Sequence, residues 1–176
     1  LPTLFAGLSS FIPNFPVWYK EFLTWNSEVC KSFEETKAVM EYFIRENFPP
    51  EYGLLEQINH PEALRKHVVR MLHYDPQPVG KVLASLHKDF GLITADCLTT
   101  HPGLCLSRNE QPMNQDLLLS EKKDHIVIFP GRKMHEVTDG AVPGLCHGVI
   151  STEEVARGAV VLFLHGPGSM GPSCPS

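Results

Sequence analysis

The chain carries two hydrophobic patterns of different period, and the change between them falls near residue 60. From Asn26 to Asn47, apolar residues recur at three- and four-residue spacing with acidic residues between them, which is typical of an amphipathic helix. These positions are Val29, Phe33, Met40, Phe43 and Ile44. Pro49 and Pro50 end the pattern, so the sequence predicts one helix of about six turns.

Downstream of residue 60 the sequence is typical of short strands separated by turns. Asn59-His60-Pro61 predicts a turn or cap that opens a short helical segment. The β-prone runs that follow are Val68 to Tyr74, Phe90 to Leu98, Gly103 to Leu106, Asp124 to Phe129, Cys146 to Ile150 and Ala156 to Leu164. Gly, Pro, Asn and Asp gather between them, so we expect a mainly β region closed by turns.

Composition and charge narrow the class of protein. The chain has 176 residues, of which 43% are hydrophobic and 20% are charged, so it can bury one sizeable core. A net charge of −5 argues against a nucleic-acid partner. No apolar run approaches the roughly 20 residues of a membrane helix, so no membrane association is expected. Five cysteines without metal-type spacing argue against a disulfide framework and favour a reducing, cytoplasmic location.

His87 and Asp89 are the strongest candidates for chemistry. Residues two apart on a strand face the same side, so the imidazole and the carboxylate could bind one metal ion. A histidine from a distant strand would complete the two-histidine, one-carboxylate set of non-haem Fe(II) oxygenases, which leaves positions open for cosubstrate and dioxygen. His147 is the candidate for this third ligand, although a strand-edge ion pair or a buried histidine would also explain these residues.

Arg157 supports the choice of His147. The two residues lie in neighbouring β-prone runs, each five positions from residue 152. If the runs form a hairpin, the two side chains lie opposite each other with Cβ atoms roughly 5 Å apart. Arginine would then be well placed to bind a carboxylate whose other end reaches the metal. His135 lacks such a partner, and the competing interpretation of Arg157 is a surface ion pair with Glu153 or Glu154.

Four separated motifs, over roughly residues 65 to 165, resemble the isopenicillin N synthase-like branch of the 2-oxoglutarate and Fe(II)-dependent dioxygenases. They are Met71-Leu72-His73-Tyr74-Asp75-Pro76-Gln77-Pro78, His87-Lys88-Asp89-Phe90-Gly91-Leu92-Ile93-Thr94, Gly131 to Gly140 before His147, and the strand that opens at Arg157. The resemblance implies a double-stranded β-helix, a distorted jelly roll, preceded here by the long helix.

The resemblance also implies roles for individual residues. His87, Asp89 and His147 would bind Fe(II), and Arg157 would bind the distal carboxylate of 2-oxoglutarate. Tyr74 matches a tyrosine that touches this cosubstrate in many relatives, although a packing role is the alternative. The implied activity uses O2 and couples oxidative decarboxylation of 2-oxoglutarate to hydroxylation, or a related oxidation, of a small organic substrate.

Two positions depart from the family pattern. Many relatives have a serine two residues after the arginine and an asparagine two before the tyrosine, where this chain has Ala159 and Leu72. Losing a hydrogen bond to a charged group costs about 1.5–3 kcal/mol, which would weaken cosubstrate binding. These departures leave open an Fe(II) oxidase of the same fold that does not use 2-oxoglutarate. A truncated, non-catalytic binding homologue is a further alternative, suggested by the N-terminal region that relatives have and this sequence lacks.

The expected domain organisation has three parts. Residues 1–64 form an N-terminal helical segment that packs on the barrel, with Trp18, Tyr19, Phe22 and Trp25 as the docking side chains. Residues 65–165 form the Fe(II)/2-oxoglutarate core, and residues 166–176 form a mobile or irregular tail rich in Gly and Pro. Because relatives have about a hundred further N-terminal residues, the chain is expected to be a short homologue or a trimmed product.

Overall fold

The structure is a computed structural model, which describes residues 15–107 and 126–168, with side chains from residue 31 onward. The chain divides into two compact units, residues 1–38 and 39–176. The helix α2, Phe15–Asn47, runs through both. It ends before Pro49 as predicted, but it begins well before Asn26. Trp18, Phe22 and Trp25 are spaced four and three apart and continue the helical period. The docking predicted for these aromatic side chains lies outside the described residues.

Short helices follow α2 in the second unit. They are η1 (Pro50–Tyr52), α3 (Leu54–Asn59) and α4 (Pro61–Leu64). The predicted cap before α4 is confirmed, because Nδ1 of His60 accepts a hydrogen bond of 3.2 Å from the backbone N–H of Glu62, and Pro61 fills the first helical position. Leu54 and Ile58 of α3 are buried, as are Met40 and Ile44 of α2, so the helices add to the apolar core of this unit.

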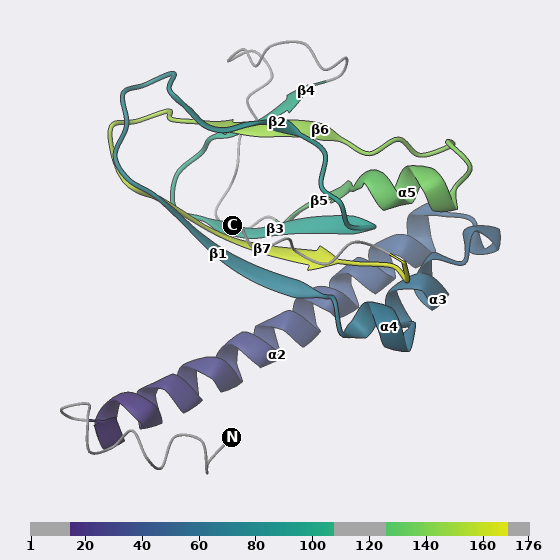
Figure 1. Ribbon diagram of the computed structural model, residues 1–176, viewed down its shortest axis with the longest axis horizontal. Coiled ribbons are helices and arrows are strands. Elements are labelled where there is room, and N and C mark those ends of the chain that lie inside the picture. Colours follow the sequence, from purple (N-terminus) through teal and green to yellow (C-terminus); the bar gives the residue numbers. More distant parts are fainter. Residues whose placement is uncertain (1–14, 108–125, 169–176) are drawn as a thin grey trace. The chain divides into compact units, whose positions relative to one another are not determined.

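The described part of the second unit is mainly β, as predicted, with two antiparallel sheets in a jelly-roll-like arrangement (Figure 1). The strands are β1 (Val68–Tyr74), β2 (Val82–His87), β3 (Ile93–Thr99), β4 (Leu104–Ser107), β5 (Val127–Pro130), β6 (Cys146–Ile150) and β7 (Arg157–Leu164). One sheet has the order β1-β7-β3-β5, and the other has the order β2-β6-β4. The bounds of β1 and β6 are those predicted, whereas residues 82–86 of β2 were not among the predicted strands.

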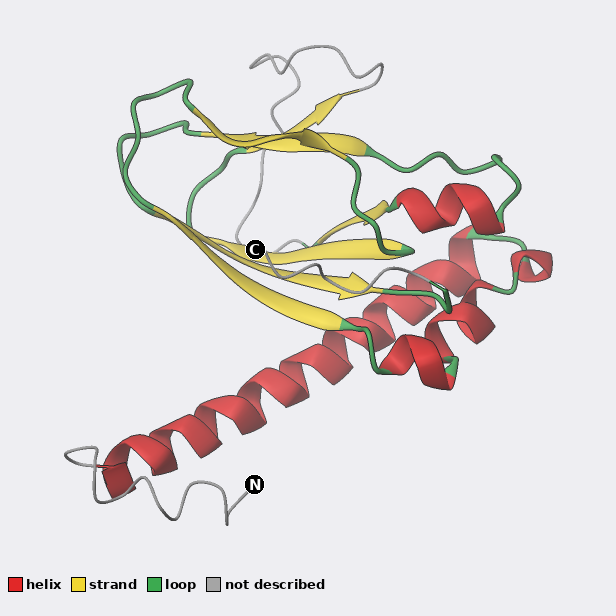
Figure 2. Ribbon diagram, in the orientation of Figure 1, coloured by secondary structure: helices red, strands yellow, loops and turns green. Residues whose placement is uncertain are grey.

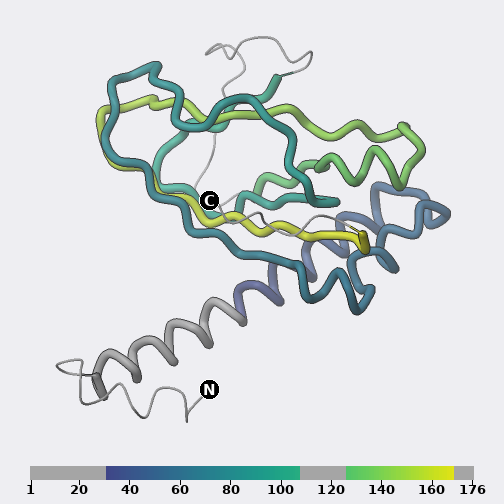
Figure 3. Tube along the Cα trace, in the orientation of Figure 1, coloured from purple at the N-terminus to yellow at the C-terminus, as the bar shows by residue number. Residues whose placement is uncertain are grey.

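The predicted hairpin between β6 and β7 is wrong. β6 pairs with β2 and β4, whereas β7 pairs with β1 and β3 in the other sheet. The segment between them crosses from one sheet to the other, as the trace in Figure 3 shows. His147 and Arg157 are therefore not cross-strand neighbours. The local sequence has the length and polarity of a hairpin turn, but the non-local partners β1, β2, β3 and β4 decide the pairing.

The four-stranded sheet has one apolar face and one face toward a cavity. Ile93 pairs with Leu164 and Ala95 with Leu162, and these four side chains are almost fully buried. The alternate residues Thr94 and Val161 line the cavity instead. Strand alternation thus separates the core of the unit from the site.

The helices α3, α4 and α5 gather at one end of the two sheets (Figure 2). The helix α5, Arg132–Val137, follows β5 directly and was not predicted.

Within the described ranges, no helix combines the length and the apolar character that crossing a membrane would require. Most of the predicted tail, residues 169–176, lies outside the described residues.

Candidate metal centre

Three candidate ligands converge between the sheets. His87 is the last residue of β2 and lies opposite His147 of β6 in the strand register. Asp89 lies just beyond β2, so it reaches the site from the connection to β3 rather than from the strand that we predicted. The ligand atoms of the three residues all lie within 4.8 Å of one another. The segment that leaves β2, not alternation within the strand, therefore brings Asp89 beside His87.

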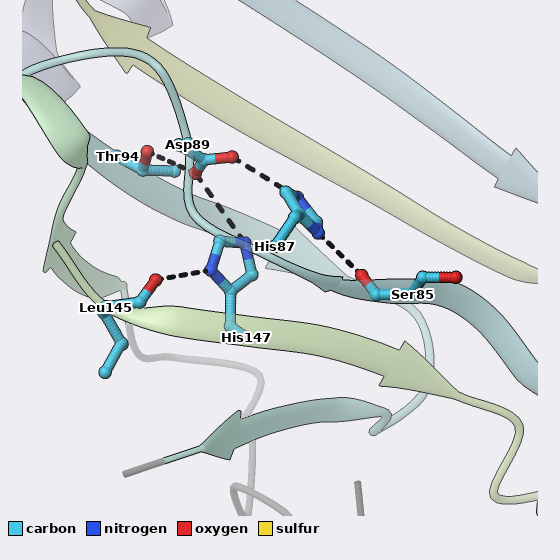
Figure 4. A network of polar contacts seen from close by, with 6 residues as sticks. All are labelled: Ser85, His87, Asp89, Thr94, Leu145 and His147. Atoms are coloured by element: carbon cyan, nitrogen blue, oxygen red, sulfur yellow. Dashed lines mark hydrogen bonds and ion pairs between the residues drawn. The ribbon is translucent and has the colours of Figure 1, made fainter. Parts of the chain in front are cut away.

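Backbone carbonyl groups orient both imidazole rings (Figure 4). Nδ1 of His87 lies 2.8 Å from the carbonyl oxygen of Ser85, and Nδ1 of His147 lies 3.2 Å from that of Leu145. A proton on each Nδ1 donates to these carbonyls, which leaves each Nε2 to face the carboxylate of Asp89. The two Nε2–Oδ distances are 3.4 Å for His87 and 3.7 Å for His147. The rings also lie close together, with centroids 4.4 Å apart.

Side-chain and main-chain contacts fix Asp89. The hydroxyl of Thr94 on β3 donates a hydrogen bond of 2.6 Å to Oδ2 of Asp89. The backbone N–H of Arg132, at the start of α5, donates to the carbonyl oxygen of Asp89 at 2.7 Å. Asp89 is thus positioned by the four-stranded sheet and by α5, neither of which contributes a candidate ligand.

Burial and charge give the three groups different pKa shifts. Burial on its own would raise the pKa of Asp89, but a hydrogen bond from the protonated form of His87, the nearby His147 and the hydroxyl of Thr94 bring this pKa below its usual value. The hydrogen bond with Asp89 raises the pKa of His87, which is half exposed. Burial lowers the pKa of His147. At neutral pH the site therefore combines an ionised carboxylate with a neutral, buried imidazole.

This donor set fits a divalent transition-metal ion. Two imidazole nitrogens and one carboxylate on one side of a metal form the facial triad of non-haem iron sites. The second nitrogen of each ring donates to a backbone carbonyl, which is the usual outer contact of a metal-binding histidine. Residues 87, 89 and 147 thus meet the requirements for holding a metal in ligand type, tautomer and proximity.

The candidate ligands open onto a cavity of about 810 Å³ between the two sheets. Arg157 and Tyr74 lie on its wall and are register partners across β7 and β1. Arg157 is buried, and its Nε donates a hydrogen bond of 2.9 Å to the carbonyl oxygen of His101. The structure therefore brings the predicted metal and cosubstrate residues to one cavity, with His147 and Arg157 on opposite sheets.

Other functional candidates in the cavity were missed at the sequence level. Thr94 belongs to the motif that follows Asp89, but nothing in that motif indicates its hydrogen bond. Asp96 is a buried carboxylate on β3 that lines the same cavity. An acidic residue inside a β-prone run was the available signal. Phe129 of β5 packs against the ring of His147, with centroids 4.6 Å apart.

Several oxygenases have a similar structure. A proposed oxygenase from Shewanella oneidensis matches with a TM-score of 0.55 and 27% identity over 89% of this chain and 57% of that protein. A full-length Neurospora crassa protein, in complex with alpha-KG and 5-formyluracil, matches with a TM-score of 0.63 and 16% identity, over 82% of this chain and 49% of that one. The Arabidopsis thaliana dioxygenase for auxin oxidation 1, in complex with 2-oxoglutarate, matches with a TM-score of 0.51 and 23% identity, over 60% and 41%.

The chain thus shares the fold of these proteins, which include a proposed oxygenase and two proteins with 2-oxoglutarate or alpha-KG bound. It spans about half the length of the proteins just described, from 41% to 57%. No family model matches the sequence, and no curated protein matches it. The evidence for a shared fold therefore comes from structure.

Proposed function

We propose that this chain is the core of a non-haem Fe(II) oxygenase that uses 2-oxoglutarate and O2 to oxidise a small organic molecule. His87, Asp89 and His147 would hold the iron, and Arg157 and Tyr74 would bind the far end of 2-oxoglutarate. The order of its four motifs favours the isopenicillin N synthase-like branch. The observation that carries the proposal is the convergence of the three ligand atoms within 4.8 Å in a cavity that also contains Arg157.

Iron with a bound 2-oxo acid would supply the redox chemistry, in which 2-oxoglutarate is decarboxylated to succinate while a substrate C–H bond is oxidised. The residues of this chain would bind the iron and the 2-oxo acid and orient them toward the substrate. Three ligands on one side of a metal leave its other side open to the cavity. Arg157 offers a planar guanidinium for a carboxylate, and Tyr74 adds a phenol hydroxyl beside it.

The size of the cavity supports a small substrate. Ligand pockets of about 300–1,000 Å³ are typical for small molecules, and this cavity falls in that range. Apolar side chains such as Phe90, Phe129 and Val149 line it together with the polar groups. The Neurospora crassa structure contains 5-formyluracil, which is a small molecule of this kind.

Two cavity residues favour a second candidate function, an Fe(II) oxidase of the same fold that does not take 2-oxoglutarate. Ala159 and Leu72 line the cavity near Arg157 and offer no side-chain hydrogen bond to a carboxylate. The carboxylate that meets Arg157 would then belong to the substrate.

An anaerobic titration separates these functions. Adding 2-oxoglutarate to the Fe(II)-loaded protein should produce the visible charge-transfer band of a chelated 2-oxo acid, and Arg157→Leu should weaken this binding at least about tenfold. The matched control is Arg45→Leu on α2, whose guanidinium is exposed. Intact Fe(II) binding without a band at any 2-oxoglutarate concentration would favour the second function. Inability to hold Fe(II) would favour a non-catalytic homologue.

A further inference from the structure

The wall of the cavity contains an acidic side chain that the proposed function does not use. Asp96 lies on β3, two residues after Thr94, so both side chains face the cavity. Its register partner on β7 is Val161. Only 7% of Asp96 is exposed. A buried carboxylate is costly unless its surroundings compensate the charge, so its neighbours matter.

Tyr74 shows that Asp96 and Arg157 act on the same region. Burial raises the pKa of the Tyr74 phenol, and the negative charge of Asp96 raises it further, whereas the positive charge of Arg157 opposes both. Tyr74 and Arg157 are direct register partners. Both charges therefore act on one phenol, and all three residues line the same cavity. A cosubstrate that extends from the metal ligands to Arg157 would pass the wall that carries Asp96.

Arg70 is the other arginine of the four-stranded sheet that lines the cavity, and its side chain extends toward Phe163. Arg70 lies in the same row as Asp96, with Val161 between them. Its guanidinium carbon lies 5.5 Å from the centroid of the Phe163 ring, which is the register partner of Thr94. Arg70 thus extends toward the row of Thr94, whereas Arg157 begins β7 at the opposite end of the cavity wall. Asp96 and Arg157 are the two charged residues that act on the pKa of Tyr74.

This arrangement offers both a cationic donor and an anionic acceptor to the far group of a ligand. A free carboxylate would be attracted by Arg157 and repelled by Asp96, and repulsion is stronger in a buried site than in water. A carboxamide matches both partners, because its oxygen can accept from Arg157 or Tyr74 while its NH2 donates to Asp96.

We propose that Asp96 is a specificity-determining residue of this cavity, which lowers its affinity for 2-oxoglutarate and raises its relative affinity for 2-oxo acids whose far end is a carboxamide. The inference rests on the proposed function, because it assumes that a 2-oxo acid binds between the metal and Arg157. It assigns to Asp96 a role in selecting the cosubstrate, not in binding the metal.

The test compares the dissociation constants of 2-oxoglutarate and its 5-amide for the full, Fe(II)-loaded chain by anaerobic calorimetry. Asp96→Asn removes the negative charge with little change in volume, and Asp96→Val provides a second variant that matches its apolar neighbours. Asp75→Asn is the control, because it makes the same charge change at a side chain that is 85% exposed. Circular dichroism and Fe(II) stoichiometry verify the fold and the metal site of each protein.

We expect Asp96→Asn to bind 2-oxoglutarate at least about tenfold more tightly than the wild type, because a like charge has been removed. Its affinity for the amide should change less than about threefold, since the asparagine oxygen still accepts a hydrogen bond. Unchanged or weaker 2-oxoglutarate binding in both Asp96 variants, with Fe(II) retained, would overturn the role of Asp96 and leave the proposed function standing. If neither 2-oxo acid binds any of the Fe(II)-loaded proteins, both the inference and the proposed function fail.

Discussion

At the scale of single residues, the candidate metal centre depends on side chains that are not candidate ligands themselves. The hydroxyl of Thr94 is one such group, because it donates to the same carboxylate oxygen of Asp89 that faces His147. A hydrogen bond to a charged acceptor contributes about 1.5–3 kcal/mol. Thr94 therefore orients Asp89 and keeps it ionised.

Thr94→Val should weaken metal binding about 10- to 100-fold, because the carboxylate loses its orienting donor while the volume of the side chain is nearly unchanged. Titration with Mn(II), followed by electron paramagnetic resonance, measures the affinity. Thr36→Val makes the same substitution on α2 and serves as the control. Equal affinities for the wild type and Thr94→Val would show that Asp89 needs no hydroxyl partner.

His165 gives a residue-scale prediction for the pH dependence of stability. Burial lowers its pKa, and the positive charges of Lys66 and Arg70 lower it further, while Asp89 opposes them. As the pH falls below the ordinary histidine value of about 6.5, the unfolded chain binds a proton that the folded protein resists. The free energy of unfolding therefore decreases as the pH falls through this range.

His165→Gln should reduce this acid-induced loss of stability, because a neutral amide does not titrate. Urea unfolding of both proteins between pH 7.5 and pH 5.5 measures the effect. His87 and Asp89 also titrate, but they are present in both proteins, so the difference between the two pH profiles isolates His165. Parallel profiles would mean that this histidine accepts a proton as readily in the folded protein as in the unfolded chain.

At the scale of elements, the start of α5 fixes the segment that carries Asp89. The backbone N–H groups of Gly131, Arg132 and Lys133 donate to the carbonyl oxygens of Leu92, Asp89 and Gly91, in that order. A Cβ at Gly131 would overlap the carbonyl oxygen of Gly91 and lie 3.1 Å from that of Asp89. A glycine is needed here because two backbone segments approach each other closely.

Gly131→Ala should lower the free energy of unfolding by about 1–3 kcal/mol, because the two segments must separate, and it should also weaken metal binding by displacing Asp89. Gly158→Ala on β7 is the control, since its Cβ would make an ordinary contact of 3.4 Å with Thr100. Urea unfolding and Mn(II) titration measure the two effects. Destabilisation with unchanged metal affinity would show that the packing of α5 does not determine the position of Asp89.

The same elements show what the sequence could predict. The bounds of β1 and β6 were predictable because each is a compact β-prone run between turn residues. The pairing of β6 and β7 was not, since hydrophobic periodicity identifies a strand but not its partner. The helix α5 has six residues, which is too short for a helical period to be recognised. The sequence did identify His87, Asp89 and His147 as residues that meet in space, but it placed Asp89 on a strand and Arg157 beside His147.

At the scale of the whole molecule, the two sheets divide the proposed functions between them. The three-stranded sheet carries His87 and His147, and the four-stranded sheet carries Arg157, Tyr74 and Asp96. A cosubstrate that reaches from the metal to Arg157 would therefore contact both sheets. The crossover between β6 and β7 makes this possible, because it places β7 in the other sheet rather than beside β6.

The central claim is that three side chains from distant segments hold one metal ion. Anaerobic Fe(II) titration of the wild type and of His87→Ala, Asp89→Ala and His147→Ala tests it most directly, with His73→Ala, which alters an exposed histidine, as the control. We predict one ion per chain in the wild type and in the control, and affinity lower by at least about 100-fold in each of the three variants. Fe(II) binding that survives in all three variants, with the fold intact, would contradict the account.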